Sequence, residues 1–318
     1  MNIVILDTLP LNPGDLDWSP LRELGVLRLH ANTKPDELFE RIENAEIIFS
    51  NKVKLPREAF RAASQLKMIG VLATGYDIVD IEAARENGVT VCNVPSYSAA
   101  FTAQSTLALL LELTHHIGAH DDAVKDGLWT KREYFSFWNY PLVELDGKTL
   151  LIVGLGNIGR KVAAIATAIG MNVIAAQLPG REVKTDSEFS YLPFNEAVAQ
   201  ADVISLHCPA TPQTRGLINA ELLSRLKPST LIVNAARGAL VDESELALAL
   251  EERRIAGYAA DVLSTEPPPK DNPLLHAPNC IITPHLSWAS PEARRRLLNA
   301  SVENLRAFLN GNPQNVVS

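Results

Sequence analysis

Cysteine is scarce in this sequence. Its 318 residues include only Cys92, Cys208 and Cys280, and none of them belongs to a C-x-x-C pair. A sparse and odd set of cysteines excludes a disulfide framework and is typical of reduced thiols in the cytosol. We therefore interpret the three thiols as small core groups rather than as redox centres.

Long apolar segments are missing too. The most apolar stretch, residues 107–113, is short and is interrupted by Glu112, so the sequence predicts no membrane span. The first residues read as a strand, without the charged and apolar regions of a signal peptide, so we expect none. Together with the cysteine usage, these features predict a cytoplasmic protein.

Positive charge is in deficit: the sequence has 29 Lys and Arg but 37 Asp and Glu, so its formal net charge is -8. An acidic surface argues against binding to nucleic acid or to an anionic membrane, but it leaves room for a local basic pocket that holds a small acid. Clusters of metal ligands are lacking as well. We interpret the pair His115–His116 as a solvated helix edge, and the sequence predicts no metal site.

What the chain does contain is a regular alternation of strand and helix patterns with a hydrophobic fraction of 47%. The length predicts two domains, and the alternation predicts an α/β fold with two doubly wound parallel sheets of the Rossmann-like type. The first domain is the smaller. Its predicted strands are 3–6, 47–49, 68–72 and 89–92, and its predicted helices are 35–44, 56–63 and 79–87.

The second domain follows a hinge predicted at residues 95–100 and a long helix predicted over 100–119. Its predicted strands are 150–153, 172–176, 202–207, 230–234, 257–262 and 280–283, with helices between them such as 243–253. One amphipathic helix, 291–309, is predicted to close the chain. This order of strands is the one expected of a dinucleotide-binding fold.

A cluster of aromatic residues follows the long helix, at Trp129, Tyr134, Phe135, Phe137 and Trp138. Such a cluster is compatible with a lid, with a subunit contact or with ordinary core. The aromatics are too dense and too irregularly spaced for one helix face. This favours a contact surface.

A glycine-rich turn opens the second domain, with Gly154, Gly156 and Gly159 in the G-x-G-x-x-G spacing after a buried strand and before a helix. Gly154 permits a tight turn, Gly156 lets a pyrophosphate approach the backbone, and Gly159 lets the helix pack close to the strand. The helix N-terminus then faces the anion. In this context the motif predicts dinucleotide binding, although a glycine-rich turn in another α/β protein has the same spacing.

Three polar residues follow predicted strands of the second domain: Arg237, Glu266 and His285. Because ligands of open α/β sheets bind at the carboxyl ends of strands, we expect these side chains to share a site. A guanidinium can bind a carboxylate in a fork, and a carboxylate beside an imidazole suits a general acid. Each residue alone also fits a structural or solvated role.

These motifs together resemble the D-isomer-specific 2-hydroxyacid dehydrogenases, nearly from end to end. The matching segments, in chain order, are 74–77, 154–159, 206–209 with 214–216, 234–238, 261–262 with 266–267, and 283–285. Within the family, residues 71–77 and 108–114 are most similar to glycerate dehydrogenase, also called hydroxypyruvate reductase.

The resemblance implies an oxidoreductase of small 2-keto acids. Arg237 would hold the substrate carboxylate and polarise the keto oxygen, and His285 would exchange a proton with that oxygen. Glu266 would hold His285 and raise its pKa. Backbone N–H groups of the loop Ala73, Thr74 and Gly75 would cap the carboxylate.

The resemblance also implies a substrate-binding, flavodoxin-like domain of residues 1–99 and 286–318, made discontinuous by the last helix, and a dinucleotide-binding domain of residues 100–285. The active site would lie in a cleft between them, closed by hinge motion near Ala99 and Leu286. The family is usually dimeric, and a homodimer is therefore expected. The implied cofactor contacts are Gly154, Gly156, Asn157, Ile158, Gly159, Gln177, Arg181, His207, Cys208, Pro209, Thr214, Ala235, Ala236, Arg237, Asp261 and His285.

One position departs from the usual pattern. The second strand of a Rossmann domain normally ends in an acid that binds the adenosine ribose and repels a 2'-phosphate. Here Gln177 takes that place, and Arg181 follows it closely. Glutamine does not repel phosphate and arginine attracts it. The sequence thus predicts relaxed choice between NAD and NADP, unless Arg181 points into solvent and NADH is still preferred.

The expected reaction is reduction of hydroxypyruvate or glyoxylate to D-glycerate or glycolate. Another D-2-hydroxyacid dehydrogenase, such as phosphoglycerate dehydrogenase, is a rival of the same class, although its frequent regulatory domain is missing here. Formate dehydrogenase fits less well, because its pattern has Gln where Glu266 stands. From another class, a binding protein that senses NAD(H), like the C-terminal-binding-protein co-repressors, would keep the same three polar residues.

Overall fold

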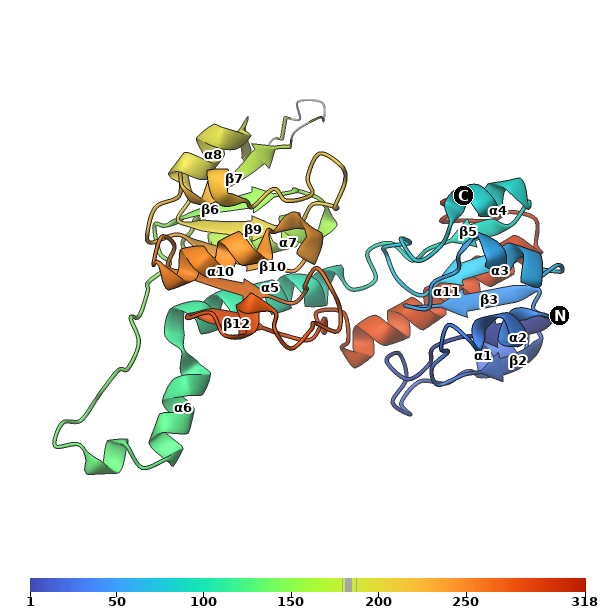
Figure 1. The fold of residues 1–318 in the computed structure, drawn as a ribbon, viewed down its shortest axis with the longest axis horizontal. Coiled ribbons are helices and arrows are strands. Elements are labelled where there is room, and N and C mark those ends of the chain that lie inside the picture. The colour runs from blue at the N-terminus through green and yellow to red at the C-terminus, as the bar shows by residue number, and fades with distance from the viewer. Residues whose placement is uncertain (179, 181–184, 187) are drawn as a thin grey trace. The chain divides into compact units, whose positions relative to one another are not determined.

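The computed structural model describes residues 1–178, 180, 185–186 and 188–318 (Figure 1). The described residues divide into two compact units: unit 1 comprises 1–98 and 288–318, and unit 2 comprises 99–287. The chain therefore crosses between the units at 98/99 and at 287/288, where the sequence predicts 99/100 and 285/286. Unit 1 is discontinuous in sequence.

Unit 1 is built on a parallel sheet with the strand order β2-β1-β3-β4-β5. Its strands are β1 Asn2–Ile5, β2 Val26–Leu29, β3 Ile47–Ser50, β4 Met68–Val71 and β5 Thr90–Cys92. The sequence pattern does not predict β2. This strand lies at the sheet edge and its residues are alternately exposed, so it lacks the continuous apolar run of the inner strands.

Helices cover both faces of this sheet because successive strand residues point to opposite sides. Val4 and Leu6 pack in one cluster with α2, α3 and α4, whereas Ile3 and Ile5 pack in another with α1 and α11. The helices are α1 Ser19–Arg22, α2 Leu38–Ile42, α3 Arg57–Ala62, α4 Ile81–Glu86 and α11 Pro291–Leu309. The last helix, α11, has the predicted bounds, while α2 is shorter than the predicted 35–44.

Unit 2 has a second parallel sheet, in the order β12-β11-β10-β9-β6-β7-β8. The order reverses beside β6, between β6 and β9, which is where open α/β sheets bind nucleotides. Its strands are β6 Thr149–Val153, β7 Asn172–Gln177, β8 Ser190–Pro193, β9 Val203–Leu206, β10 Leu231–Asn234, β11 Gly257–Ala260 and β12 Cys280–Ile282. The sequence does not predict β8, a partly exposed edge strand that ends in a proline.

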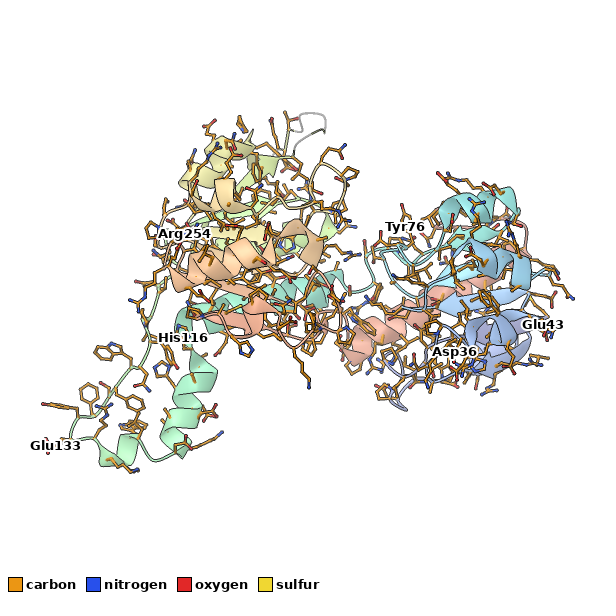
Figure 2. All side chains as sticks on the ribbon, viewed as in Figure 1. Asp36, Glu43, Tyr76, His116, Glu133 and Arg254 are labelled. Carbon is orange, nitrogen blue, oxygen red and sulfur yellow. The ribbon has the colours of Figure 1, made fainter. Side chains whose placement is uncertain are left out.

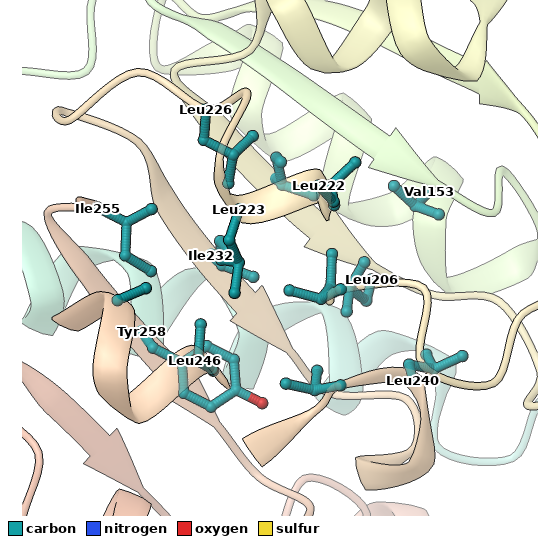
Figure 3. Packing of buried hydrophobic residues seen from close by; sticks show 14 of the residues in the cluster. Val153, Leu206, Leu222, Leu223, Leu226, Ile232, Leu240, Leu246, Ile255 and Tyr258 are labelled. Atoms are coloured by element: carbon teal, nitrogen blue, oxygen red, sulfur yellow. The ribbon is translucent and has the colours of Figure 1, made fainter. Parts of the chain in front are cut away.

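Helices cover both faces of this sheet as well. One core cluster joins the strands to α5 and α7, and the other joins them to α8, α9 and α10. In Figure 3, Leu222 of α9 and Leu246 of α10 lie against Leu206, Ile232 and Tyr258 of the sheet. The helices of unit 2 are α5 Ala99–His115, α6 Ile117–Lys125, α7 Asn157–Ala168, α8 Phe194–Gln200, α9 Ala220–Leu223 and α10 Glu243–Glu251, with 3-10 turns η1 Trp129–Lys131, η2 Gly238–Leu240 and η3 Pro273–Leu275.

The predicted single helix over 100–119 is wrong in one respect. The helix breaks at His116, which has a φ of 51°, and α6 then continues in a new direction to Lys125. Residues 117–142, here called the arm, project from the sheet of unit 2, and Figure 2 labels His116 at the base of the arm and Glu133 near its end. Among the described residues, no helix is both long and apolar enough to cross a membrane.

Candidate active site

The glycine-rich turn joins β6 to α7. Gly154 has a φ of +107°, and a Cβ atom there would lie 2.7 Å from the backbone nitrogen of Cys208. A Cβ at Gly159 would lie 2.3 Å from the carbonyl oxygen of Gly154. These two glycines thus serve the packing of the protein itself. A Cβ at Gly156 would meet no atom of the described residues within 4 Å, so the space beside it can admit a ligand such as a pyrophosphate.

A cavity of about 160 Å³ adjoins this turn. It is lined by Gly154, Leu155, Gly156, Ala176, Gln177, Leu178, Tyr191, His207, Cys208 and Pro209. Gln177 is the last residue of β7, where the sequence predicts the ribose contact. Sequence reasoning missed Tyr191, because this residue belongs to the unpredicted strand β8; its pairing opposite Ala175 brings it to the cavity.

His207 follows β9 at the cavity wall. Its Nε2 lies 2.8 Å from the hydroxyl oxygen of Ser205, and its buried Nδ1 has no hydrogen-bond partner in the described part of the chain. Burial lowers the pKa of His207 to about 4, so the ring is neutral at physiological pH. A buried ring nitrogen without a partner, together with the open space at Gly156, fits a polar cofactor bound here.

Thr214 is 2% exposed, and its hydroxyl closes the loop that follows β9. The hydroxyl donates to the carbonyl oxygen of Pro209 at 2.7 Å and accepts from the backbone N–H of Thr211 at 2.8 Å. Its visible role is therefore to shape the loop that carries His207, Cys208 and Pro209. The cofactor contact that the resemblance implies for Thr214 stays a prediction.

Arg237 stands in the loop between β10 and η2. The fully buried Asn234 shapes this loop: its side chain donates to the carbonyl of Arg237 at 2.9 Å and accepts from the N–H of Ala236 at 3.0 Å. At Gly238 a Cβ would come within 1.9 Å of the backbone of Leu263, so glycine is required there. Sequence reasoning named Asn234 as part of a motif without its role, because the role depends on the closed loop.

Glu266 and His285 are brought together although 19 residues separate them. His285 Nδ1 lies 2.6 Å from Glu266 Oε2, and the other carboxylate oxygen accepts from the N–H of Leu263 at 3.1 Å. Both side chains are about one-third exposed or less, at 33% and 26%. Gly238, beside Arg237, packs on the same Leu263. The loops of all three predicted residues thus meet at the carboxyl ends of β10, β11 and β12.

Asp261 follows β11 and is 1% exposed. Its carboxylate accepts from the hydroxyl of Thr283 at 2.6 Å and from the backbone N–H groups of Leu286 and Ser287 at 2.9 and 2.8 Å. The sequence predicts Asp261 as a cofactor contact. The structure shows it bonded to the loop that carries His285, a role that no local pattern indicates.

In unit 1, the loop Ala73, Thr74 and Gly75 follows β4. Three hydrogen bonds attach it to Asn93 and Val94: Thr74 Oγ1 donates to Val94 O at 2.9 Å, Asn93 Nδ2 to Thr74 O at 2.7 Å, and Val94 N to Ala73 O at 3.0 Å. These bonds use carbonyl and hydroxyl groups of the loop. The backbone N–H groups of residues 73–75 donate to no acceptor within the described ranges.

The remaining predicted cofactor residues are placed by the same elements. Asn157 and Ile158 open α7, and Ala235 and Ala236 lie in the loop after β10. Arg181 lies outside the described residues.

Comparison with known proteins gives a consistent set of similarities. The profile described as "D-isomer specific 2-hydroxyacid dehydrogenase, NAD binding domain" matches residues 107–287. A hydroxypyruvate reductase of Blautia hydrogenotrophica is 44% identical over 100% of both chains. A glycerate dehydrogenase of Methylorubrum extorquens is 39% identical over 89% of this chain and 88% of its own. The crystal structure of an NADPH-dependent glyoxylate/hydroxypyruvate reductase from Sinorhizobium meliloti, in complex with citrate, superposes with a TM-score of 0.86 at 27% identity, over 100% of this chain and 97% of the other.

Proposed function

The chain belongs to the D-isomer-specific 2-hydroxyacid dehydrogenases, which are NAD(P)-dependent oxidoreductases, and on this premise we propose that it reduces hydroxypyruvate or glyoxylate. The products would be D-glycerate and glycolate. The similarity to a hydroxypyruvate reductase over the full length of both chains supports this choice of substrate class.

One observation carries the proposed chemistry: the 2.6 Å contact between His285 Nδ1 and Glu266 Oε2. The carboxylate fixes the orientation of the imidazole ring. The opposite ring nitrogen, Nε2, then delivers a proton to the keto oxygen. In the reverse direction it accepts that proton from the hydroxy acid.

Arg237 completes the proposed reduction by binding the substrate. Its guanidinium would bind the carboxylate with two hydrogen bonds and polarise the keto group. This binding would also hold the carbonyl carbon in position. The bound nicotinamide supplies the hydride. In unit 1, the backbone N–H groups of Ala73, Thr74 and Gly75 stay predicted substrate contacts.

A steady-state assay tests the proposal. The full-length protein would be assayed with hydroxypyruvate, glyoxylate, pyruvate and phosphonooxypyruvate, each with NADH and with NADPH. We expect kcat/KM to be highest for hydroxypyruvate or glyoxylate, and in reverse we expect D-glycerate to be oxidised in preference to L-glycerate. Preference for phosphonooxypyruvate would instead identify a phosphoglycerate dehydrogenase, and binding of NADH without turnover of any acid would contradict the proposal.

We also propose that NADPH is accepted, because Gln177 offers no negative charge against a 2'-phosphate. The variant Gln177→Asp should lower kcat/KM with NADPH at least about 10-fold relative to NADH, through repulsion in a confined site. Dissociation constants of 2',5'-ADP and 5'-AMP, measured by calorimetry, report the same discrimination without turnover. A parent enzyme that uses only NADH would refute this part of the proposal.

A homodimer held by the arm is the proposed assembly. Large apolar side chains of the arm are highly exposed, with Tyr134 at 76%, Phe135 at 90%, Trp138 at 68% and Leu142 at 57%. Exposed apolar surface of this density is typical of an interface.

A further inference from the structure

The arm carries two histidines that contact the chain on its way back to unit 2. In Figure 1 the arm leaves unit 2 along α6 and comes back as an extended chain, residues 132–142, here called the return segment. Every residue of the return segment except Phe137 is exposed. The contacts between this segment and α6 therefore decide whether the arm keeps one shape.

His120, on α6, uses both of its ring nitrogens. Nδ1 lies 2.7 Å from the carbonyl oxygen of His116, and because a carbonyl oxygen only accepts, Nδ1 carries the proton of that bond. Nε2 lies 3.2 Å from the backbone nitrogen of Asn139, whose N–H is the donor. An imidazole that donates at one nitrogen and accepts at the other is neutral, so this pair of contacts fits the neutral ring.

A further proton on the ring of His120 would break this arrangement. The proton would sit on Nε2, whose N–H would then face the N–H of Asn139, and the bond between α6 and the return segment would be lost. Histidine takes up such a proton between about pH 8 and pH 5. Asn139 is the neighbour of Trp138, whose side chain is 68% exposed, so the loss also releases part of the apolar surface of the arm.

His116 favours the neutral state at the base of the arm as well. It is 9% exposed, and its ring stacks on Tyr140 with the centroids 4.7 Å apart. Burial lowers the pKa of His116; on α5, Glu112 opposes this shift and His115 adds to it, as does His120 on α6. The contribution of the neutral ring to stability is fully present above pH 6.5 and is lost as the pH falls toward the lowered value.

The other charged and titratable groups around His120 do not offset the loss. The ring lies 6.2 Å from Phe137 and 6.0 Å from Tyr140, centroid to centroid, and the guanidinium of Arg132 lies over the ring of Phe137 at 5.8 Å. Arg132 adds positive charge, and a phenol is uncharged between pH 5 and pH 8. On α6, Asp121 forms an ion pair with the lysine one turn further along.

We propose that His120 makes the arm a pH-sensitive contact surface: the neutral ring holds the return segment in the shape that binds a second copy of this chain, and the protonated ring releases it. The inference rests on the proposed homodimer and adds its control by pH. A two-fold dimer contains the arm twice, so the loss of the bond to Asn139 counts twice. At about five-fold for each bond, the dissociation constant of the dimer should rise about 25-fold.

Sedimentation equilibrium of the full-length protein at about pH 7.5 and pH 5.5 tests the proposal, since histidine titrates between these values. The dissociation constant of the parent dimer should rise about 25-fold at the lower pH. His120→Gln does not titrate but keeps both a donor and an acceptor, so its dissociation constant should change less than about three-fold. A parent with equal dissociation constants at both pH values, or a His120→Gln protein with the parental pH dependence, would overturn the proposal.

His276→Gln is the matched control. It makes the same substitution at an exposed histidine outside the arm, so it should retain the pH dependence of the parent. His120→Phe is a second variant, which keeps an aromatic ring against Phe137 and Tyr140 but removes both hydrogen bonds. It should dimerise weakly at both pH values. Tight dimerisation of His120→Phe would show that the ring contacts are sufficient, and it would overturn the role of the bonds.

Hydrogen exchange of the Asn139 amide separates the switch from the dimer. Its protection factor, measured by NMR and corrected for the intrinsic rate at each pH, should fall at least about five-fold in the parent at the lower pH. In His120→Gln it should stay constant. A parent that is monomeric at both pH values and shows this pattern would contradict the proposed homodimer and still support the switch. Unchanged protection in the parent would overturn the switch even where the dimer forms.

Discussion

At the scale of single residues, the contact between His285 and Glu266 determines how the imidazole can act. Because Nδ1 faces the carboxylate at 2.6 Å, the proposed proton exchange with a substrate would fall to Nε2. The sequence places both residues after strands, and only the fold brings them into hydrogen-bonding distance.

His285→Ala should lower kcat by about 10²- to 10⁴-fold, the usual contribution of a general acid, while the dissociation constant of NADH stays within about two-fold. Stopped-flow turnover and fluorescence titration measure the two quantities. His276→Ala, an exposed histidine nine residues earlier, should behave like the parent. If His285→Ala turned over normally, the assigned acid would be wrong.

Arg237→Ala should raise KM for the keto acid and depress kcat, because both the carboxylate contact and the polarisation of the keto oxygen are lost. Arg237→Lys retains the charge but not the planar fork, so it should recover activity only in part. Steady-state kinetics of the two variants check this expectation. Full activity of Arg237→Lys would show that a positive charge without the planar fork is sufficient to bind the substrate carboxylate and polarise the keto oxygen.

His207 makes the stability of unit 2 depend on pH. Burial lowers its pKa from 6.5 to about 4, so its contribution to the unfolding free energy is fully present above pH 6.5 and is lost as pH falls toward 4. The difference corresponds to roughly 3 kcal/mol. Urea denaturation without cofactor should show that His207→Gln loses less unfolding free energy than the parent between pH 7 and pH 4.

The comparison isolates His207, because His30 and His116, whose pKa values burial also lowers, remain in both proteins. Identical pH dependence of the parent and the variant would mean that His207 is protonated in the folded state as readily as in the unfolded chain.

At the scale of elements, the loops after β10 and β11 pack against each other, backbone on backbone. A Cβ at position 238 would lie 1.9 Å from Leu263 and 2.2 Å from Ser264. The Arg237 loop and the Glu266 loop are therefore in direct backbone contact.

Gly238→Ala should push these loops apart, with a loss of about 1–3 kcal/mol of unfolding free energy and a fall in kcat larger than the fall in folded fraction. Gly118→Ala is the control, since Gly118 lies on the exposed helix α6 and the nearest atom to its added Cβ is Oε1 of Glu112, 3.4 Å away. Thermal unfolding and kinetics would be compared for the two. Normal turnover of Gly238→Ala would show that the loops tolerate separation.

At the scale of the whole molecule, the arm determines the expected assembly. His116 stacks on Tyr140 with ring centroids 4.7 Å apart, and the N–H of Asn139 donates to His120 Nε2 at 3.2 Å, so the arm has its own internal contacts. The side chains of Phe135 and Trp138 stay exposed, which suits a surface that binds a second copy.

The double variant Phe135→Asp/Trp138→Asp should turn the proposed dimer into a monomer, since charges replace apolar contact area. Light scattering after size-exclusion chromatography measures the mass directly. Leu248→Asp, on the surface of α10 with 43% exposure, should leave the dimer intact. A parent protein that is monomeric at micromolar concentration would contradict the proposed assembly.

Local patterns were sufficient where the apolar residues of a segment form a clear pattern. The inner strands β1, β3 and β4, buried on both faces, appear as short apolar runs, and α11 appears as an amphipathic helix with a Ser290 cap. The edge strands β2 and β8 were not predicted, because strands with half-exposed residues have a weaker pattern of apolar residues. The break at His116 escaped it too, since no glycine or proline marks the position.

Local patterns in the sequence are enough to predict the α/β class and the glycine-rich turn and to single out Arg237, Glu266 and His285 as candidates, because strand periodicity and turn chemistry are local properties. The folded structure alone shows that His285 meets Glu266, that Asn234 closes the arginine loop, and that Asp261 holds the histidine loop. The contacts of His285 and Asp261 join residues that are distant in sequence, and they exist only once parallel strands bring their carboxyl ends to one edge of the sheet.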